Sequence, residues 1–205
     1  MSDRSSKYAA MAENFSRTAY ADPAGYLRYR AQLIVELEPA LAPGDVVLDL
    51  ACGDGALAVP LLAAGMRYIG IDSTPEMVAE AKRNGVDARE GDLNSYAPPE
   101  PIAATTCFRA IYYVEDRSEF FEHAAGYTGK KLVFDLNPRQ YAPAGIVGQL
   151  REAGWTHVTL RPFFHPQLRR LPRPVLAVLR LAERIGPLAR LILRFRFTYL
   201  VVASR

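Results

Sequence analysis

Three aspartates in the first half of the chain stand at the ends of short segments that are expected to be strands. Asp49 and Asp72 each close an apolar run, and Asp92 follows a third expected strand at residues 86–89. Short apolar runs bounded by small and polar residues are typical of buried strands. Because parallel strands end at the same edge of a sheet, we expect the three carboxylates to lie along one edge. There they can accept hydrogen bonds from the hydroxyl and amino groups of a nucleoside.

The loop after Asp49 consists of small residues, in the order Ala51-Cys52-Gly53-Asp54-Gly55. It leads from an apolar run into an amphipathic segment, which predicts a strand, a tight turn and the start of a helix. Glycine adopts backbone conformations that other residues avoid and has no side chain to hold a ligand away. The pattern therefore predicts a turn at which a ligand lies close to the main chain.

The acids and the loop together resemble the motifs of class I S-adenosylmethionine-dependent methyltransferases, in particular the small-molecule enzymes of the type 11 and type 25 groups. The first motif of that family is an acid followed by glycines at alternate positions. Here it reads Asp49-x-Ala51-x-Gly53-x-Gly55, with alanine at the first glycine position. The resemblance implies an α/β fold: a Rossmann-like, seven-stranded, mostly parallel sheet with helices on both faces and an antiparallel last strand.

The resemblance also implies S-adenosylmethionine as the methyl donor and assigns roles to residues. The loop would hold the methionine part, while Asp49 would accept loop N–H groups and place negative charge near the sulfonium. Asp72 would accept from both ribose hydroxyls, and Asp92 from the adenine amino group. The implied cofactor-binding residues are Tyr20, Arg30, Asp49, Ala51, Gly53, Gly55, Asp72, Ser73, Met77, Asp92, Leu93 and Arg109.

The acceptor is expected at the end of the fourth strand, where Tyr112 and Tyr113 follow an apolar stretch. A tyrosine there can line the methyl-transfer channel or hydrogen-bond the nucleophile, and the alternative is that both pack on the following helix. His165, at the end of the sixth expected strand, is a third candidate catalytic residue. The implied reaction is an in-line displacement, in which an O, N or C nucleophile approaches the sulfonium methyl to about 3 Å.

Two other nucleotide-related motifs fit less well. A dinucleotide site requires a third glycine, but Ala56 and Leu57 follow Gly55. The segment Asp135-Leu136-Asn137-Pro138 is similar to the motif of enzymes that methylate exocyclic amino groups of bases. It follows the fifth expected strand rather than the fourth and has leucine at a proline position. We therefore discount both interpretations.

Strand-like and helix-like segments alternate from residue 46 onward, which predicts one α/β domain over residues 1–205. Residues 1–42 are expected to form a helical region, broken near Asp22-Pro23 and rich in tyrosine, that either covers the cofactor as a lid or packs on the sheet edge. The expected strands are residues 46–50, 67–71, 86–89, 103–109, 131–135, 157–164 and 195–203, and the expected helices are residues 55–64, 75–84, 116–126 and 143–154.

Basic charge is concentrated at the carboxyl end. Residues 161–205 carry ten arginines, no lysine and one acid, Glu183, a formal charge of +9, whereas the remaining residues sum to −6. Within this region, residues 165–194 form an amphipathic insertion before the last strand. Three interpretations are open: a cap over the acceptor pocket, a peripheral contact with an anionic membrane, or a nucleic-acid contact. The absence of lysine and of aromatic residues from residues 172–194 disfavours the nucleic-acid interpretation.

The composition favours a cytoplasmic protein, with membrane association as an alternative. We find no basic-then-apolar leader, no run of 18 uncharged apolar residues, and no spacing typical of a metal site. Cys52 and Cys107 are expected to be reduced. The predicted function is methyl transfer to a small-molecule or lipid acceptor. The alternatives are an RNA methyltransferase and a non-catalytic S-adenosylmethionine-binding protein of the same fold.

Overall fold

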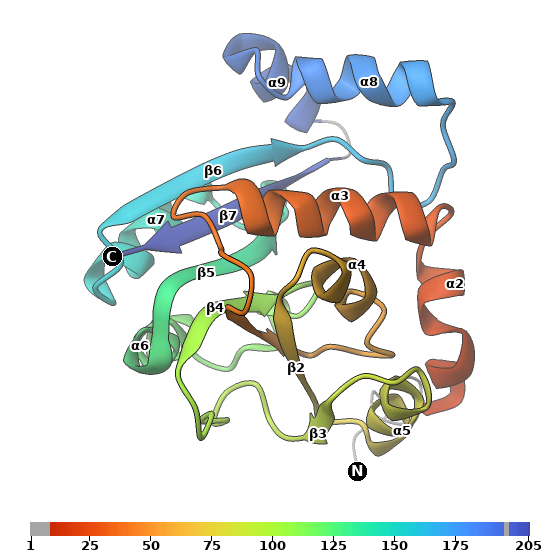
Figure 1. The fold of residues 1–205 in the computed structure, drawn as a ribbon. Coiled ribbons are helices and arrows are strands. Elements are labelled where there is room, and N and C mark those ends of the chain that lie inside the picture. The colour runs from red at the N-terminus through yellow and green to blue at the C-terminus, as the bar shows by residue number, and fades with distance from the viewer. Residues whose placement is uncertain (1–8, 195–196) are drawn as a thin grey trace.

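The computed structural model describes residues 9–194 and 197–205. Residues 1–8 of the expected amino-terminal region, and residues 195–196 at the expected start of the last strand, lie outside this description. Within it, the chain folds as strands and helices that alternate from residue 46 onward, as the sequence predicts (Figure 1).

The described strands form a seven-stranded sheet in the order β3-β2-β1-β4-β5-β7-β6. The neighbouring strands from β3 to β5 pair in parallel, and β7 pairs antiparallel with both β5 and β6. The predicted fold class is therefore confirmed. The strands are β1 (Val46–Leu50), β2 (Arg67–Asp72), β3 (Ala88–Glu90), β4 (Ile102–Cys107), β5 (Thr128–Leu136), β6 (His157–Phe163) and β7 (Thr198–Ser204).

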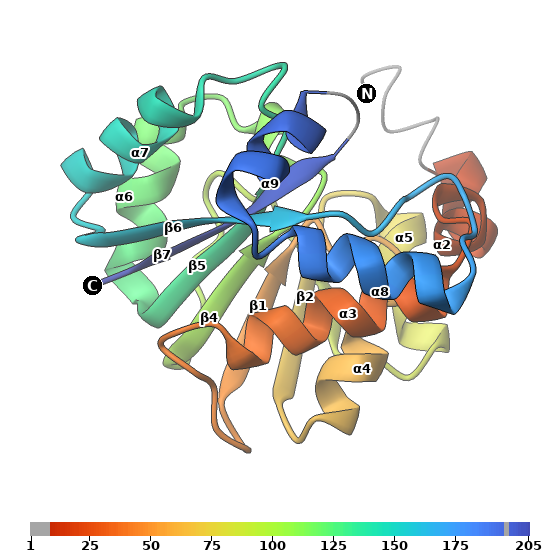
Figure 2. The ribbon, with the colours of Figure 1, turned by 90° about the horizontal axis from the view of Figure 1, so that it is seen from above.

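Helices cover both faces of the sheet because successive strand residues point to opposite sides. Val47 packs with the helices α3 (Pro23–Glu36), α4 (Ala58–Ala63) and α5 (Pro75–Arg83). Its neighbour Leu48 packs on the other face with α6 (Arg117–Tyr127) and α7 (Pro143–Glu152). Figure 2 shows these two helical layers on either side of the strands.

The amino-terminal region contains a capped helix and makes long-range contacts with the rest of the fold. Asp22 caps α3 by accepting from the Gly25 N–H at 3.2 Å, and Pro23 occupies the first turn. A 3₁₀ turn (Ala12–Asn14) and the short helix α2 (Phe15–Ala19) precede it. Ser16 in α2 donates from its backbone N–H and its hydroxyl to the Asp54 carboxylate, at 2.9 and 2.6 Å. This pair docks α2 onto the loop after β1.

The expected insertion before the last strand contains two helices, α8 (Arg173–Ala182) and α9 (Gly186–Leu193). Figure 1 shows α8 beyond the β6 edge of the sheet, and Figure 2, seen from that edge, shows it over α3. The Arg180 guanidinium lies 3.9 Å from the ring centre of Tyr29 in α3. Glu183 accepts hydrogen bonds from the Tyr29 hydroxyl and, at 2.6 Å, from the Phe164 N–H. Among the described residues, no helix is both long and apolar enough to cross a membrane.

Candidate active site

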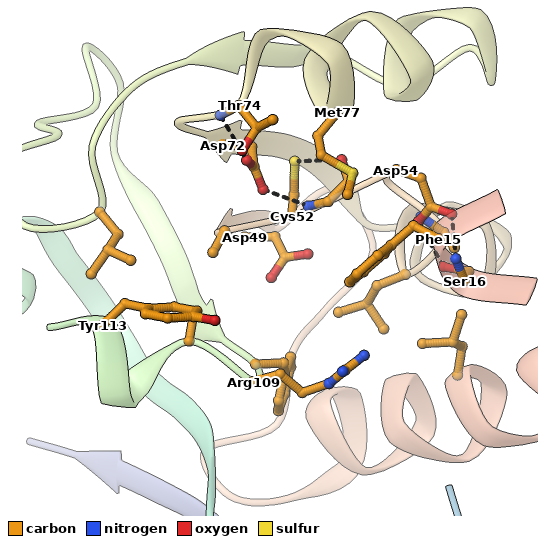
Figure 3. A pocket seen from close by; sticks show the side chains of 18 of the residues that line it. Phe15, Ser16, Asp49, Cys52, Asp54, Asp72, Thr74, Met77, Arg109 and Tyr113 are labelled. Atoms are coloured by element: carbon orange, nitrogen blue, oxygen red, sulfur yellow. Dashed lines mark hydrogen bonds between the residues drawn. The ribbon is translucent and has the colours of Figure 1, made fainter. Parts of the chain in front are cut away.

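A cavity of about 270 Å³ lies at the carboxyl ends of β1, β2 and β4, and residues of α2, α3, α5 and the segment after β3 also line it (Figure 3). Small-molecule sites have volumes of roughly 300–1,000 Å³, so this cavity is near the lower end of that range. The predicted site residues that line it are Tyr20, Arg30, Asp49, Ala51, Gly53, Asp72, Ser73, Met77, Leu93, Arg109, Tyr112 and Tyr113. Gly55, Asp92 and His165 do not line it.

The loop between β1 and α4 turns sharply beside this cavity. Ala51 and Gly53 have φ values of 59° and 58°, in the left-handed region that favours glycine. A Cβ on Gly53 would lie 3.1 Å from the ring of Phe15. A Cβ on Gly55 would instead meet Ala81 and Val86, each at 3.1 Å. Gly53 thus allows close approach at the cavity, whereas Gly55 serves the packing of the turn, which corrects its expected place at the cofactor.

Asp72, at the end of β2, holds the loop in place. One carboxylate oxygen accepts from the Gly53 N–H at 2.9 Å, and the other accepts from the Thr74 N–H at 2.9 Å. Each oxygen retains a lone pair that can accept from a ligand hydroxyl. Burial raises the pKa of Asp72 from its ordinary value, and the two N–H donors oppose that rise. The carboxylate therefore accepts hydrogen bonds that hold the loop and also lines the cavity.

Asp49 differs from its expected role as an acceptor of loop N–H groups. Its carboxylate accepts from the hydroxyls of Tyr68 and Thr106, at 2.7 and 2.6 Å, and it is only 3% exposed. Burial raises the pKa of Asp49 to about 6, although the two hydroxyls and the nearby Arg30 guanidinium favour the ionised form. The loop contact expected of Asp49 is made by Asp72 instead.

Asp92 lies outside the cavity, contrary to the expectation for the adenine site. It is exposed and accepts from the backbone N–H and the side-chain amide of Asn94, at 2.7 and 2.8 Å. This is an Asx-type turn, in which the side chain replaces a backbone hydrogen bond. Its neighbour Leu93 does line the cavity.

Two arginines face the cavity from the other side, and Asp135 organises both. Arg30 in α3 is 1% exposed, lies 4.1 Å from the Phe108 ring centre, and places Nη2 3.8 Å from Asp135 Oδ2. The other oxygen of Asp135 accepts from the backbone N–H of Arg109 at 2.7 Å. Arg30 Nε and Arg109 Nη1 are buried without a hydrogen-bond partner among the described residues. Figure 3 shows Arg109 across the cavity from Asp72.

The three candidate catalytic residues separate into two groups. Tyr112 and Tyr113 lie in a 3₁₀ turn (Ile111–Tyr113) and line the cavity, with ring centres 4.5 Å apart. His165 is 5% exposed and packs with its ring centre 5.4 Å from that of Tyr26, outside the cavity. Burial, and then the positive charge of Arg180, lower its pKa. The structure therefore gives His165 a packing position rather than contact with a ligand.

The insertion at residues 165–194 is likewise separate from the cavity, because it contributes no residue to the lining. This corrects the interpretation of the insertion as a cap over the acceptor pocket. Conversely, sequence reasoning missed several lining residues, of which Phe15, Ser16 and Asp54 belong to the contact between α2 and the loop.

Comparison with known proteins agrees with this geometry. Residues 47–129 match the family model of the methyltransferase domain. The trans-aconitate 2-methyltransferase of Mycobacterium tuberculosis is 36% identical over 75 residues, which is 36% of this chain and 29% of that protein. The 23S rRNA (uracil(1939)-C(5))-methyltransferase of Shewanella sediminis is 41% identical over 49 residues, 24% of this chain and 11% of that protein. The chain thus spans less than a third of these curated relatives.

Solved structures extend the likeness to the whole fold. The magnesium protoporphyrin IX methyltransferase of Synechocystis superposes with a TM-score of 0.65 at 17% identity, covering 100% of this chain and 98% of that one. Phosphoethanolamine N-methyltransferase 2 of Haemonchus contortus gives 0.61 at 15% identity, covering 86% of this chain and 52% of that one. The chain thus carries a match to the methyltransferase domain at residues 47–129, and its whole fold is similar to that of S-adenosylmethionine-dependent methyltransferases. Enzymes of this family use S-adenosylmethionine as methyl donor.

Proposed function

We propose that this protein transfers the methyl group of S-adenosylmethionine to a small organic acceptor that carries an anionic group. The observation that carries the proposal is the division of one cavity into two ends. The end formed by β1 and β2 carries Asp49 and Asp72, and the end formed by α3 and the residues after β4 carries Arg30 and Arg109. The sulfonium of the donor suits the acidic end, and the basic end suits two anionic groups: the methionine carboxylate of the donor at Arg30 and the acceptor at Arg109.

The lining residues suit S-adenosylmethionine in one orientation. The ribose would meet the remaining lone pairs of Asp72, the adenine would lie between Met77 and Leu93, and the methionine part would follow the loop at Gly53. Arg30 Nε, buried and without a partner, would bind the methionine carboxylate, because an unmatched buried donor gains most from an ionic acceptor. The charge of Asp49 would then favour the cationic sulfonium over a neutral thioether.

The acceptor would lie beyond the methyl group, near Arg109, Tyr112 and Tyr113. The described lining residues include no histidine, lysine or glutamate, and Asp49 is already hydrogen-bonded to two hydroxyls. A nucleophile that is ionised before it binds, such as a carboxylate or a phenolate, needs no base. The nucleophile forms a bond to the methyl carbon while the carbon–sulfur bond breaks and leaves its electron pair on sulfur. The protein's part is alignment, an effect that reaches several kcal/mol in well-oriented reactions.

Two alternatives remain distinct from this proposal. An RNA methyltransferase would need a basic surface leading to the cavity, but the arginine-rich insertion contributes no lining residue. A non-catalytic protein would need only the β1–β2 end of the cavity to bind S-adenosylmethionine. That alternative does not explain why Arg109 Nη1 is buried without a hydrogen-bond partner among the described residues. The trans-aconitate enzyme named above acts on a carboxylate-bearing small molecule, which agrees with the proposed acceptor class.

The test is methyl transfer from labelled S-adenosylmethionine to a metabolite and lipid extract separated by anion exchange. We expect label in compounds retained by the column before reaction, and a loss of at least about tenfold in kcat/KM for Arg109→Gln. The exposed Arg139→Gln serves as control and should transfer normally. Label only in unretained compounds, unchanged transfer by Arg109→Gln, or label that ribonuclease removes would contradict the proposal. Binding without transfer to any fraction would favour the non-catalytic alternative.

A further inference from the structure

The helices α8 and α9 expose a row of aliphatic side chains. Val175, Val178 and Leu181 share one side of α8, Leu188 and Leu191 share one side of α9, and Ile185 lies between the two helices. Leu181 also lines a surface groove beside α3. The row consists of Val175, Val178, Leu181, Ile185, Leu188 and Leu191, which are 40–67% exposed. We call these residues, together with the exposed arginines around them, the α8–α9 face.

The packing of the two helices does not use this row. Ala182, Ala189 and Leu193 form a small core with Phe164 on the side toward the rest of the fold. Glu183, which is 3% exposed, joins this side to Tyr29, Arg161 and Phe164 through hydrogen bonds. The helices are therefore held by one side while the aliphatic row remains in water, an arrangement typical of surfaces that meet a partner or a membrane.

All exposed charge in this segment is positive. The exposed arginines at residues 169–194 are Arg169, Arg170, Arg173, Arg184, Arg190 and Arg194. The single acid of residues 161–205 is the buried Glu183, so the segment itself contributes no exposed carboxylate, and Arg184 shares a surface groove with Glu36 of α3. Arg180 is not part of the face, since it is half-buried against the Tyr29 ring.

We propose that the α8–α9 face docks the protein on the surface of an anionic lipid bilayer, with the aliphatic row inserted between headgroups and the arginines at the phosphates. This combination of an apolar side and a cationic border is the one that interfacial helices use. Two copies of the chain joined through the same face would bring arginines against arginines, which disfavours self-association. Nucleic acid stacks its bases on aromatic side chains, and every member of the row is aliphatic.

The test is co-sedimentation of the full chain with vesicles of phosphatidylcholine containing about one quarter phosphatidylglycerol, a composition chosen to give an anionic surface. We expect binding at low salt, little binding to pure phosphatidylcholine, and release at high salt because the charges are screened. Arg173→Gln, Arg184→Gln, Arg190→Gln and Arg194→Gln together should weaken binding roughly tenfold or more. The matched control is Lys82→Gln, Arg83→Gln, Arg139→Gln and Arg151→Gln, which removes the same charge from exposed positions elsewhere.

The aliphatic row is tested separately by Val178→Ser with Leu188→Ser. Its control is Val59→Ser with Leu62→Ser on α4, where the side chains are 63% and 47% exposed, compared with 67% and 40% in the test pair. Only the first pair should reduce vesicle binding. Since all four side chains are exposed, we expect both pairs to keep the wild-type melting temperature.

Several results would overturn the proposal. These are no binding of the wild type to anionic vesicles at low salt, equal binding to both lipid compositions, and equal loss in test and control variants. A dimer in sedimentation velocity that dissociates in Val178→Ser with Leu188→Ser would assign the face to self-association instead. Because the face lines no part of the cavity, its variants should bind S-adenosylhomocysteine normally. Failure of the membrane test therefore leaves the proposed methyl transfer untouched.

Discussion

The Asp72 carboxylate accepts a hydrogen bond of 2.9 Å from the backbone N–H of Gly53, and so ties the end of β2 to the loop after β1. The contact joins residues that neighbouring strands bring together at the cavity edge. Its effect is to fix the loop in the conformation that a ligand would meet, before any ligand arrives. Preformed geometry lowers the entropy cost of binding.

Gly53→Val should abolish cofactor binding. Valine at a φ of 58° is strained by about 1–3 kcal/mol, and its Cβ would lie 3.1 Å from the Phe15 ring. Calorimetric titration with S-adenosylhomocysteine measures the loss. Gly44→Val is the control: it has similar strain at a φ of 89°, with no atom within 4 Å of the new Cβ, so it should lose stability but bind. Normal binding by Gly53→Val would show that the loop does not hold the ligand.

Ala51→Gly should stabilise the protein. Ala51 has a φ of 59°, a conformation that costs an L-residue about 1–2 kcal/mol. Glycine removes that cost but adds about 0.5–1 kcal/mol of chain entropy, so the expected gain is at most about 1 kcal/mol. Urea unfolding measures the change. Ala79→Gly, at an exposed interior position of α5, should instead lose about 1 kcal/mol. A destabilised Ala51→Gly variant would mean that the alanine side chain makes contacts worth more than the strain.

The titration of Asp49 should be visible in the stability of the ligand-free protein. Its pKa rises from about 3.9 in the unfolded chain to about 6 in the fold. The folded state then binds more protons between these values, so this carboxyl makes stability fall as pH rises from 4 to 6, by about 2–3 kcal/mol. Above pH 6 its contribution is constant. The measurement is urea unfolding of wild type and Asp49→Asn at each pH. Parallel pH profiles of the two proteins would contradict the raised pKa.

Tyr112→Phe and Tyr113→Phe test the acceptor end. Both rings line the cavity, and a hydroxyl that aligns the nucleophile acts mainly in the transition state. At least one variant should lower kcat, with little change in the affinity for S-adenosylmethionine. Single-turnover kinetics on the acceptor found in the extract provides the measurement. Wild-type rates in both variants would mean that neither hydroxyl aligns the nucleophile and that the two rings serve only in packing.

Local patterns were sufficient for the fold and for one side of the site. Apolar runs and small-residue loops predicted β1 and β2, and with them the positions of Asp72 and Gly53 at one edge. The position of Asp92 outside the cavity was not visible in the sequence, because β3 is short and the backbone N–H of Asn94 in the following turn donates to the carboxylate. The position of an acid at the end of a strand does not show whether neighbouring groups already donate hydrogen bonds to its carboxylate.

Contacts between residues far apart in the chain could not be predicted from the sequence. The donors to Asp49 are Tyr68 and Thr106, which reach it only because β2 and β4 flank β1. Ser16 meets Asp54 across 38 residues of sequence, and no local signal predicts that pair. The packing of the α3 tyrosines against the His165 ring is a similar long-range contact. Each of these depends on how elements pack rather than on how they form.

The central claim, that the cavity at the β1–β2 edge binds S-adenosylmethionine, is tested most directly by calorimetric titration of wild type, Asp72→Ala and Asp92→Ala. The wild type should bind one S-adenosylmethionine per chain. Asp72→Ala removes the carboxylate that holds the loop and faces the ligand, and should weaken binding by about 1–3 kcal/mol. Asp92→Ala removes an exposed carboxylate outside the cavity and should bind as the wild type does. Absence of binding by the wild type, or equal weakening in the two variants, would contradict the account.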